Sequence, residues 1–261
     1  MEFQITNNFK INYSKNIGKV LYIVEGEKTE INVLLKVFKY ILGYNVVYKK
    51  RNNTSFKLQS VKNPNSVIYI LNSRTSNISS IQDYKYLADE LLNIIKYNSE
   101  LNIDIQNIRK YYIFDCDRPE DKEEQIKDLI NKYKNSLDLS EEYEFGGMLL
   151  LNYPSIESFL IENFATNTFT LSDSLIEEGK IKEYLNKNKY LPNNITKDTL
   201  ENAIKEMIFA LENISCSCID LDDTSKFNIN IYDYEKQRNF KYILSLIIIS
   251  FIDMGIIEII K

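Results

Sequence analysis

The chain has 261 residues, of which 44% are hydrophobic and 26% are charged, and its formal net charge is −5. These values are ordinary for one or two globular domains, and the acidic balance argues against a protein that coats nucleic acid through a basic surface. Because the chain contains no histidine, catalytic triads with a histidine base and zinc sites with histidine ligands are excluded.

The cysteines indicate a reducing compartment. The chain has three of them, Cys116, Cys216 and Cys218, which is too few for a disulfide framework in a chain of this length. No signal peptide is recognisable at the start of the sequence. We therefore expect reduced cysteines with mainly structural roles, in a cytoplasmic protein.

Short apolar runs alternate with amphipathic segments over the first part of the chain. The apolar runs predict strands at Lys19–Val24, Val46–Tyr48, Val67–Leu71, Tyr111–Phe114 and Met148–Leu151. Apolar residues at helical spacing predict helices at Ile31–Leu42, Ile81–Tyr97, Gln125–Tyr133 and Glu157–Phe164. This alternation predicts an α/β domain over residues 1–165, with a mostly parallel sheet flanked by helices.

Residues 166–261 have a different pattern, which predicts a helical C-terminal region. Helices are expected at Leu175–Leu185 and Leu200–Leu211. The nearly continuous apolar run Tyr242–Ile252 is too short to cross a bilayer, so it indicates a core helix or an oligomer contact and no membrane span. We expect the segment Tyr242–Ile260 to mediate homodimerisation or the binding of a partner protein.

The segment Val20–Glu30, with the sequence V-L-Y-I-V-E-G-E-K-T-E, contains the first candidate site residues. Its strand ends on Glu25, at the edge of the sheet where open α/β proteins bind ligands. Gly26 permits a sharp turn, and Thr29 is a suitable cap for the next helix. Glu30 lies in the first turn of that helix, whereas Glu27 is expected to face solvent.

Further carboxylates follow two later strands. Asp115 and Asp117 are two residues apart in an extended segment and therefore point to the same side, and Glu157 follows another strand. If the three strands are parallel neighbours, five carboxylates gather at one edge: Glu25, Glu30, Asp115, Asp117 and Glu157. Their repulsion favours a divalent cation, and all-oxygen ligands favour Mg²⁺ or Mn²⁺. The ordinary alternatives are a solvated Asp-x-Asp turn and a dipole-stabilised Glu157.

These motifs resemble a known family. Glu25–Glu30 after an apolar strand, followed by Phe114–Asp117 after another, resembles the Toprim fold, and the form E-G-x-x-T-E is similar to its RloB-like and OLD-like branch. The segment Pro154–Leu160 resembles one found in RloB-like proteins and in the Toprim effector of the PARIS anti-phage system. The resemblance covers roughly residues 19–165 and leaves the C-terminal region unassigned.

The resemblance implies a Toprim-like (Rossmann-like) catalytic domain over residues 1–165, with an insertion at about 52–105. It implies a Mg²⁺-dependent endonuclease that cleaves RNA (for example tRNA) or DNA and acts as an anti-phage defence effector, controlled by a partner such as an ATPase sensor. Glu25, Asp115 and Asp117 would be catalytic metal ligands, with Glu30 and Glu157 as additional ligands. The catalytic lysine of OLD-type enzymes has no counterpart that the sequence identifies.

Basic residues near the expected edge are candidates for binding substrate phosphates. They are Arg118, Lys49, Lys50, Arg51 and Arg74. Ordinary solvated loop charges are the alternative interpretation.

Three other functions also stay open: a Toprim module that binds or senses nucleic acid without cleavage and acts through a partner, a primase-like nucleotidyl transferase, and an interaction protein with surface acids. The acidic net charge and the lack of a zinc-binding domain disfavour the transferase.

Overall fold

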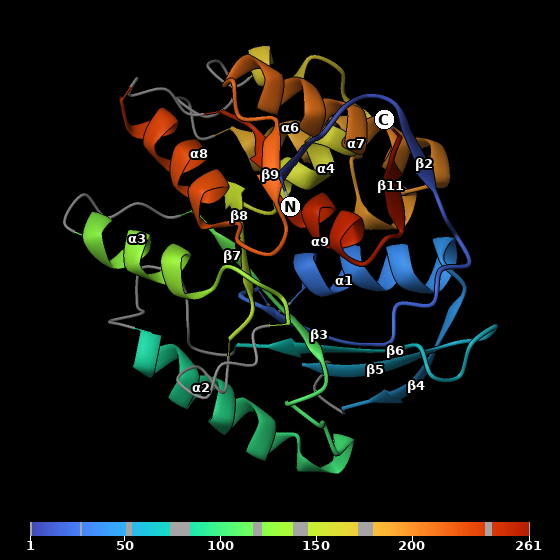
Figure 1. The fold of residues 1–261 in the computed structure, drawn as a ribbon. Coiled ribbons are helices and arrows are strands. Elements are labelled where there is room, and N and C mark those ends of the chain that lie inside the picture. Colours follow the sequence, from blue (N-terminus) through green and yellow to red (C-terminus); the bar gives the residue numbers. More distant parts are fainter. Residues whose placement is uncertain are drawn as a thin grey trace.

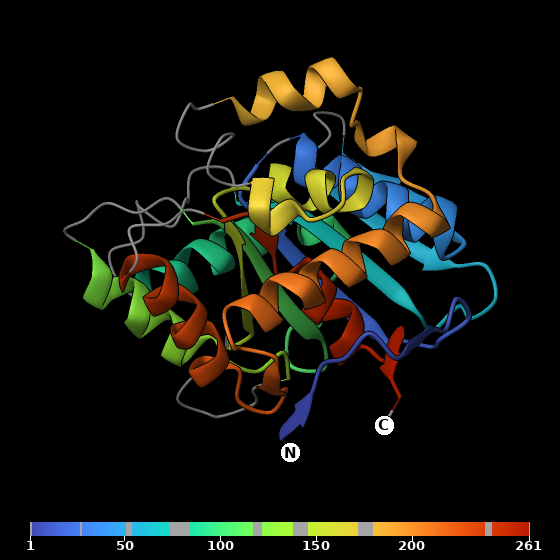
Figure 2. The same ribbon diagram turned by 90° about the horizontal axis from the view of Figure 1, so that it is seen from above.

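The computed structural model describes the chain over residues 2–26, 28–50, 54–73, 84–116, 122–137, 146–171, 180–237 and 242–260. A central seven-stranded sheet organises these stretches, and helices cover both of its faces (Figures 1 and 2). The α/β class predicted from the alternating pattern is therefore confirmed.

The strand order in the sheet is β10-β8-β7-β3-β6-β5-β4. The four inner strands run parallel, whereas β10 at one edge and β5 and β4 at the other pair antiparallel. The sheet is therefore mixed, with a parallel centre. The strands are β3 (Lys19–Val24), β4 (Tyr44–Lys49), β5 (Ser55–Ser60), β6 (Val67–Asn72), β7 (Arg109–Asp115), β8 (Met148–Tyr153) and β10 (Leu244–Ser245).

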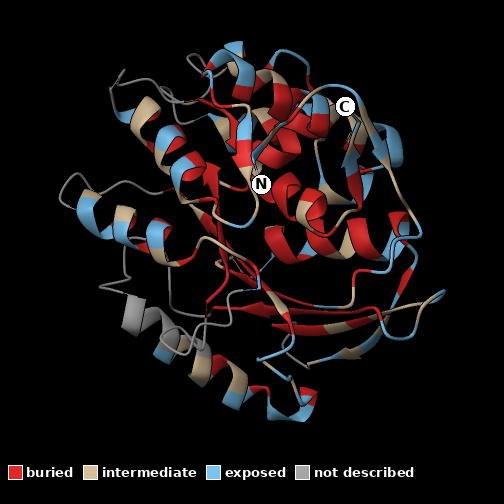
Figure 3. Cartoon of the chain, in the orientation of Figure 1, coloured by how far each residue is buried: buried red, intermediate tan, exposed pale blue. Residues whose placement is uncertain are grey.

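The parallel centre of the sheet is buried on both faces, which explains why its strands are continuous apolar runs in the sequence (Figure 3). On one face, Tyr22 of β3 stacks on Tyr111 of β7, with ring centroids 5.1 Å apart, and lies 5.7 Å from Phe38. On the other face, Tyr112 packs edge-on against Tyr133 at 4.8 Å. Successive residues of β7 thus serve opposite layers.

The helices form the two outer layers. Figure 1 shows α2 and α3 on one side of the sheet and α1, α4 and α9 on the other, and α8 packs against α3. The helical elements are α1 (Thr29–Leu35), its π-helical continuation η1 (Lys36–Ile41), α2 (Tyr84–Tyr97), η2 (Ser99–Leu101), α3 (Glu123–Lys132), α4 (Glu157–Phe164), α6 (Ile181–Asn188), η4 (Pro192–Asn194), α7 (Lys197–Asn213), α8 (Ser225–Gln237) and α9 (Ile247–Asp253).

The C-terminal region contains helices, as expected, but it also contributes three short strands. One of them, β10, joins the central sheet beside β8. The other two form antiparallel ribbons with the start of the chain: β9 (Cys218–Asp220) with β1 (Glu2–Gln4), and β11 (Ile257–Ile259) with β2 (Phe9–Ile11). The chain beyond residue 165 is therefore built into the main core. The first residues of the helix expected at Leu175–Leu185 lie outside the described residues.

The apolar run Tyr242–Ile252 is buried throughout and divides into β10 and α9. Its interpretation as a core element is confirmed, whereas the homodimer or partner contact expected over Tyr242–Ile260 stays a prediction. Among the described helices, none has the length and apolarity needed to cross a membrane.

The sequence analysis missed β5, which it interpreted as part of a polar loop. Phe56 and Leu58 of this strand are buried, whereas the alternate residues Lys57 and Gln59 are partly exposed. Two apolar residues within six are a weak signal, and the strand depends on pairing with β4 and β6 on its two sides.

Truncation of Phe251 should destabilise the whole chain, because its ring is 1% exposed and packs edge-on against Phe38, with centroids 5.8 Å apart. We expect Phe251→Ala to lower the free energy of unfolding by about 3–5 kcal/mol. Urea denaturation followed by circular dichroism measures this change. The exposed Val61 provides a control, since Val61→Ala should change stability by less than about 0.5 kcal/mol. Two separate transitions, only one of them shifted, would contradict a common core.

Candidate functional site

The three strands that precede the predicted acidic residues are neighbours in the sheet, in the order β8-β7-β3. Val24 is in register with Ile113, and Asp115 is in register with Asn152. Because these strands are parallel, their carboxyl ends meet at one edge. Glu25 directly after β3, Asp115 at the end of β7 and Glu157 at the start of α4 are therefore brought to the same place.

Glu25 links the ends of β3 and β7. Its Oε2 accepts a hydrogen bond of 3.0 Å from the backbone amide of Asp115, and its own amide donates to the carbonyl of Ile113 at 3.1 Å. On the other side, the Asn72 side chain at the end of β6 donates to the carbonyl of Glu25 at 3.0 Å. The backbone of this residue is thus fixed between two strands.

Glu30 turns back from α1 onto the loop that follows β3. Its side chain is almost fully buried, and its Oε1 accepts a 3.0 Å hydrogen bond from the amide of Gly26. A Cβ atom at position 26 would collide with the Glu30 carboxylate. A side chain at position 26 would therefore displace the Glu30 carboxylate from its present position.

Asp115 carries the strongest sign of uncompensated charge in the site. Its Oδ1 accepts a 2.8 Å hydrogen bond from the amide of Ile156. Burial raises the pKa of Asp115 to about 8, despite that bond. Three neighbouring carboxylates contribute to this rise, in the order Glu30, Glu25 and Glu157. At neutral pH this aspartate therefore retains a proton when no cation is bound.

Burial also raises the pKa of Glu30, and the negative charge of Glu157 adds to this effect. The amides of Glu30 itself and Gly26 oppose it, as does the charge of Lys182. The carboxylates of Glu25, Glu30, Asp115 and Glu157 thus lie close enough for their charges to interact. This convergence joins four of the five acids singled out in the sequence, while Asp117 lies outside the described residues.

Lys182 is the residue of this site that the sequence analysis missed. It lies in the first turn of α6, with its ammonium 3.8 Å from Oε1 of Glu157, and its side chain is 84% exposed. The hydroxyl of Ser155 holds the other oxygen of Glu157 at 2.7 Å. No spacing relates Lys182 to the acidic motifs, so only the packing of α6 near α4 reveals it.

Of the predicted phosphate-binding residues, the structure describes Lys49 and Lys50, and neither lies with the carboxylates. Lys50 directly follows β4, which lies three strand spacings or about 14 Å from β3. Its ammonium bonds the carbonyl of Tyr97 at 2.6 Å and lies 3.2 Å from Glu100, so its role there is structural. Lys49 is exposed at the same edge of the sheet. The remaining candidates, Arg51, Arg74 and Arg118, lie outside the described residues.

The donors at this edge fit a hard divalent cation, because all of them are carboxylate oxygens. Within the described stretches, no group of three or more acidic or cysteine side chains is arranged so that it could hold a metal ion. Backbone amides instead occupy one oxygen each of Glu25, Glu30 and Asp115. Glu25, Glu30, Asp115 and Glu157 are the residues that would hold Mg²⁺ or Mn²⁺.

The raised pKa of Asp115 predicts a pH-dependent penalty on stability. An unfolded aspartate titrates near pH 4, so folding takes up a proton between roughly pH 4 and pH 8, and stability falls as pH rises through this window. Asp115→Asn removes the penalty. In EDTA we expect the variant to be more stable by on the order of 2 kcal/mol at pH 8, with a gain that shrinks towards pH 4.

Thermal denaturation at several pH values measures this difference. Asp128→Asn on the exposed side of α3 is the matched control and should leave the pH profile unchanged. Identical profiles for the wild type and Asp115→Asn would show that the carboxylates do not interact as the geometry indicates.

Comparison with known proteins adds no assignment. No family model, no curated protein and no solved structure matches this chain. The chemical interpretation of the site therefore depends on its own residues and on their arrangement at the carboxyl ends of β3, β7 and β8.

Proposed function

We propose that this protein is a divalent-metal-dependent nuclease of the Toprim type that hydrolyses phosphodiester bonds in RNA or DNA. One observation supports it above all: Glu25, Glu30, Asp115 and Glu157 converge at three neighbouring strand ends, where burial and then the charges of the other three acids raise the pKa of Asp115 to about 8. A cluster of carboxylates with perturbed pKa values at a sheet edge is typical of a functional site.

The acids of the site would hold Mg²⁺ or Mn²⁺, and a bound cation would supply charge stabilisation to the oxygens of a transferring phosphoryl group. The protein itself contributes the fixed positions of the acidic side chains. The amides of Asp115, Gly26 and Ile156 fix the side chains of Glu25, Glu30 and Asp115 before any ligand arrives. Asp117, which follows Cys116 in the chain, would complete the ligand set.

Lys182 would bind the scissile phosphate. Its ammonium lies 3.8 Å from Glu157, and its side chain is 84% exposed, so it can also reach a substrate oxygen. Lys49, which is exposed at the end of β4, would contact a flanking phosphate.

The biological role that we propose is that of an anti-phage defence effector held in check by a partner protein. The support for this role is the resemblance of Glu25–Glu30 and Pro154–Leu160 to defence nucleases. A nuclease of that kind would act on cellular RNA or DNA, so its activity would have to be restrained until infection.

Nuclease assays with Mg²⁺ or Mn²⁺ test the proposal on labelled RNA and DNA, with EDTA as the metal-free control. We expect Glu25→Gln to lower the cleavage rate by at least about 100-fold, because it removes one charged ligand while preserving the shape of the side chain. Lys182→Met should lower the rate by about tenfold or more. Glu212→Gln and Lys187→Met, on the exposed faces of α7 and α6, are the matched controls.

Equal cleavage by the wild type and Glu25→Gln would contradict the assignment of the site, and no cleavage of any substrate would favour a binding module. Binding of the uncut nucleic acid by Glu25→Gln separates these outcomes, since a nuclease variant should retain its substrate while failing to cut it.

A further inference from the structure

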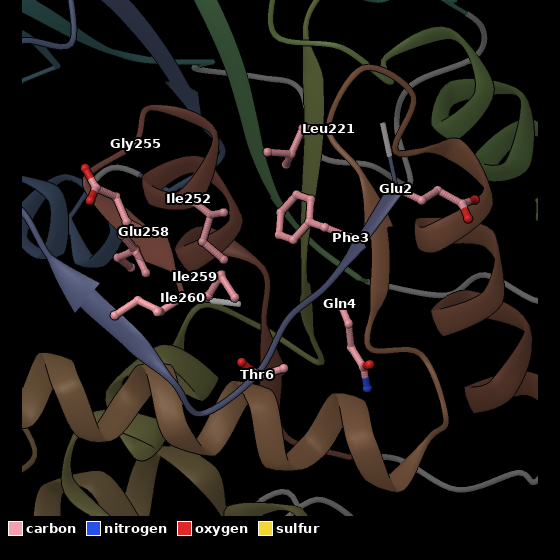
Figure 4. A pocket seen from close by; sticks show the side chains of 11 residues that line it. Glu2, Phe3, Gln4, Thr6, Leu221, Ile252, Gly255, Glu258, Ile259 and Ile260 are labelled. Carbon is pink, nitrogen blue, oxygen red and sulfur yellow. The ribbon is translucent and has the colours of Figure 1, made fainter.

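A groove of about 700 Å³ lies between the two antiparallel ribbons, β1 with β9 and β2 with β11, which we call the terminal ribbons. It lies away from the carboxylates. Figure 4 shows Phe3 of β1 pointing towards Ile252 of α9, with Leu221 above them and Ile259 at the opposite wall. The groove lies near the opposite edge of the sheet, because Asp253 beside it is hydrogen-bonded by Tyr111 near the start of β7. It is therefore separate from the site at the other end of β7.

One wall of the groove is a free strand edge. β1 pairs with β9 in the register Phe3↔Ile219, and the amide of Ile5 donates to the carbonyl of Ser217 at 2.8 Å. Hydrogen-bonded pairs alternate in an antiparallel ladder, so Phe3 and Ile5 direct their backbone groups to β9. Gln4 between them directs its amide and carbonyl outward, into the groove that it lines.

The opposite wall is a second free edge. The amide of Ile260 donates to the carbonyl of Asn8 at 2.8 Å, and the amide of Asn12 donates to the carbonyl of Ile256 at 2.7 Å. By the same alternation, Ile257 and Ile259 of β11 direct their backbone groups away from β2 and into the groove. Within the described stretches, neither free edge pairs with another strand.

We propose that this groove binds an extended segment of a partner protein, which adds as a strand between β1 and β11. Two facing strand edges offer hydrogen bonds on both sides of one strand, a geometry that neither a helix nor a compact ligand can satisfy. The apolar floor formed by Phe3, Leu221 and Ile252 would receive side chains at alternate positions of that strand.

The charges at the groove indicate that the incoming segment is basic. Glu2 and Glu258 are the charged residues that line it, and both are exposed. Lys226 lies 3.8 Å from Glu2 in an exposed pair, which contributes little and can be exchanged for a lysine of the partner. The occupant is therefore a segment in which apolar residues alternate with lysine or arginine.

Fluorescence polarisation with a labelled eight-residue peptide of alternating valine and lysine tests the proposal on the full chain. We expect saturable binding, weakened about tenfold or more by the double variant Glu2→Lys/Glu258→Lys. A peptide with glutamate in place of lysine should bind at least about tenfold more weakly. Glu100→Lys at the far end of the sheet is the matched control and should leave binding unchanged.

Amide hydrogen exchange examines the strand geometry itself. The peptide should slow the exchange of Gln4, Ile257 and Ile259, whereas Phe3 and Ile5 are already protected by β9 and should change little. A peptide methylated on alternate backbone nitrogens should lose this protection. The proposal is overturned if no peptide binds up to about 1 mM, if the methylated peptide binds as well, or if Glu2→Lys/Glu258→Lys instead dissociates a dimer of this chain.

A nuclease assay separates this peptide-binding proposal from the nuclease function proposed above. The double variant Glu2→Lys/Glu258→Lys changes none of the residues at the carboxylate edge, so it should cleave as the wild type does while failing to bind the peptide. Loss of the peptide site and loss of the active site are thus distinguishable.

Discussion

The repulsion among the carboxylates at the ends of β3, β7 and β8 is the constraint on which the rest of this structure depends. Backbone amides hold three of these acids: the amide of Asp115 donates to Glu25, the amide of Ile156 to Asp115, and the amide of Gly26 to Glu30, whereas the Ser155 hydroxyl donates to Glu157. These bonds stabilise individual charges but do not neutralise the group. A proton retained on Asp115 compensates part of the charge, as its raised pKa indicates.

The fold maintains this arrangement because the parallel centre of the sheet is buried and rigid, and because the C-terminal region is bonded to it. Asn152 lies in register with Asp115, and the hydroxyl of Ser245 in β10 donates a 2.6 Å hydrogen bond to the side-chain oxygen of Asn152. The amide of Ser245 then donates to Glu162 at 3.0 Å. Burial raises the pKa of Glu162 well above its usual range. A buried polar row thus connects the acidic edge with α4.

The sequence was sufficient for the parts of the fold that depend on local patterns. Continuous apolar runs predicted β3 and β7, and the acids at their ends could be placed because strand ends of a parallel sheet share an edge. Lys182 could not be predicted, since it approaches Glu157 only through the packing of α6. The role of Lys50 could not be predicted either, because its partners at Tyr97 and Glu100 come from a distant segment.

The groove between the terminal ribbons could not be predicted either, because it also depends on contacts between distant segments. It arises from pairing between residues at the two ends of the chain, such as Phe9 with Ile259, and no local pattern in either segment indicates a partner for it. The short strands β1, β2, β9 and β11 have three residues each, which is too few for periodicity to identify. Contacts between distant segments therefore account for most of the features that could not be predicted from the sequence.

Calorimetric titration of Mn²⁺ at pH 7, in two buffers of different ionisation enthalpy, tests the central claim most directly. If the carboxylates form a cation site, binding should release on the order of one proton per chain, because the cation displaces the proton held by Asp115. Asp115→Asn should bind more weakly and release no such proton. Absence of Mn²⁺ binding at millimolar concentration, or equal proton release by the wild type and the variant, would contradict the account.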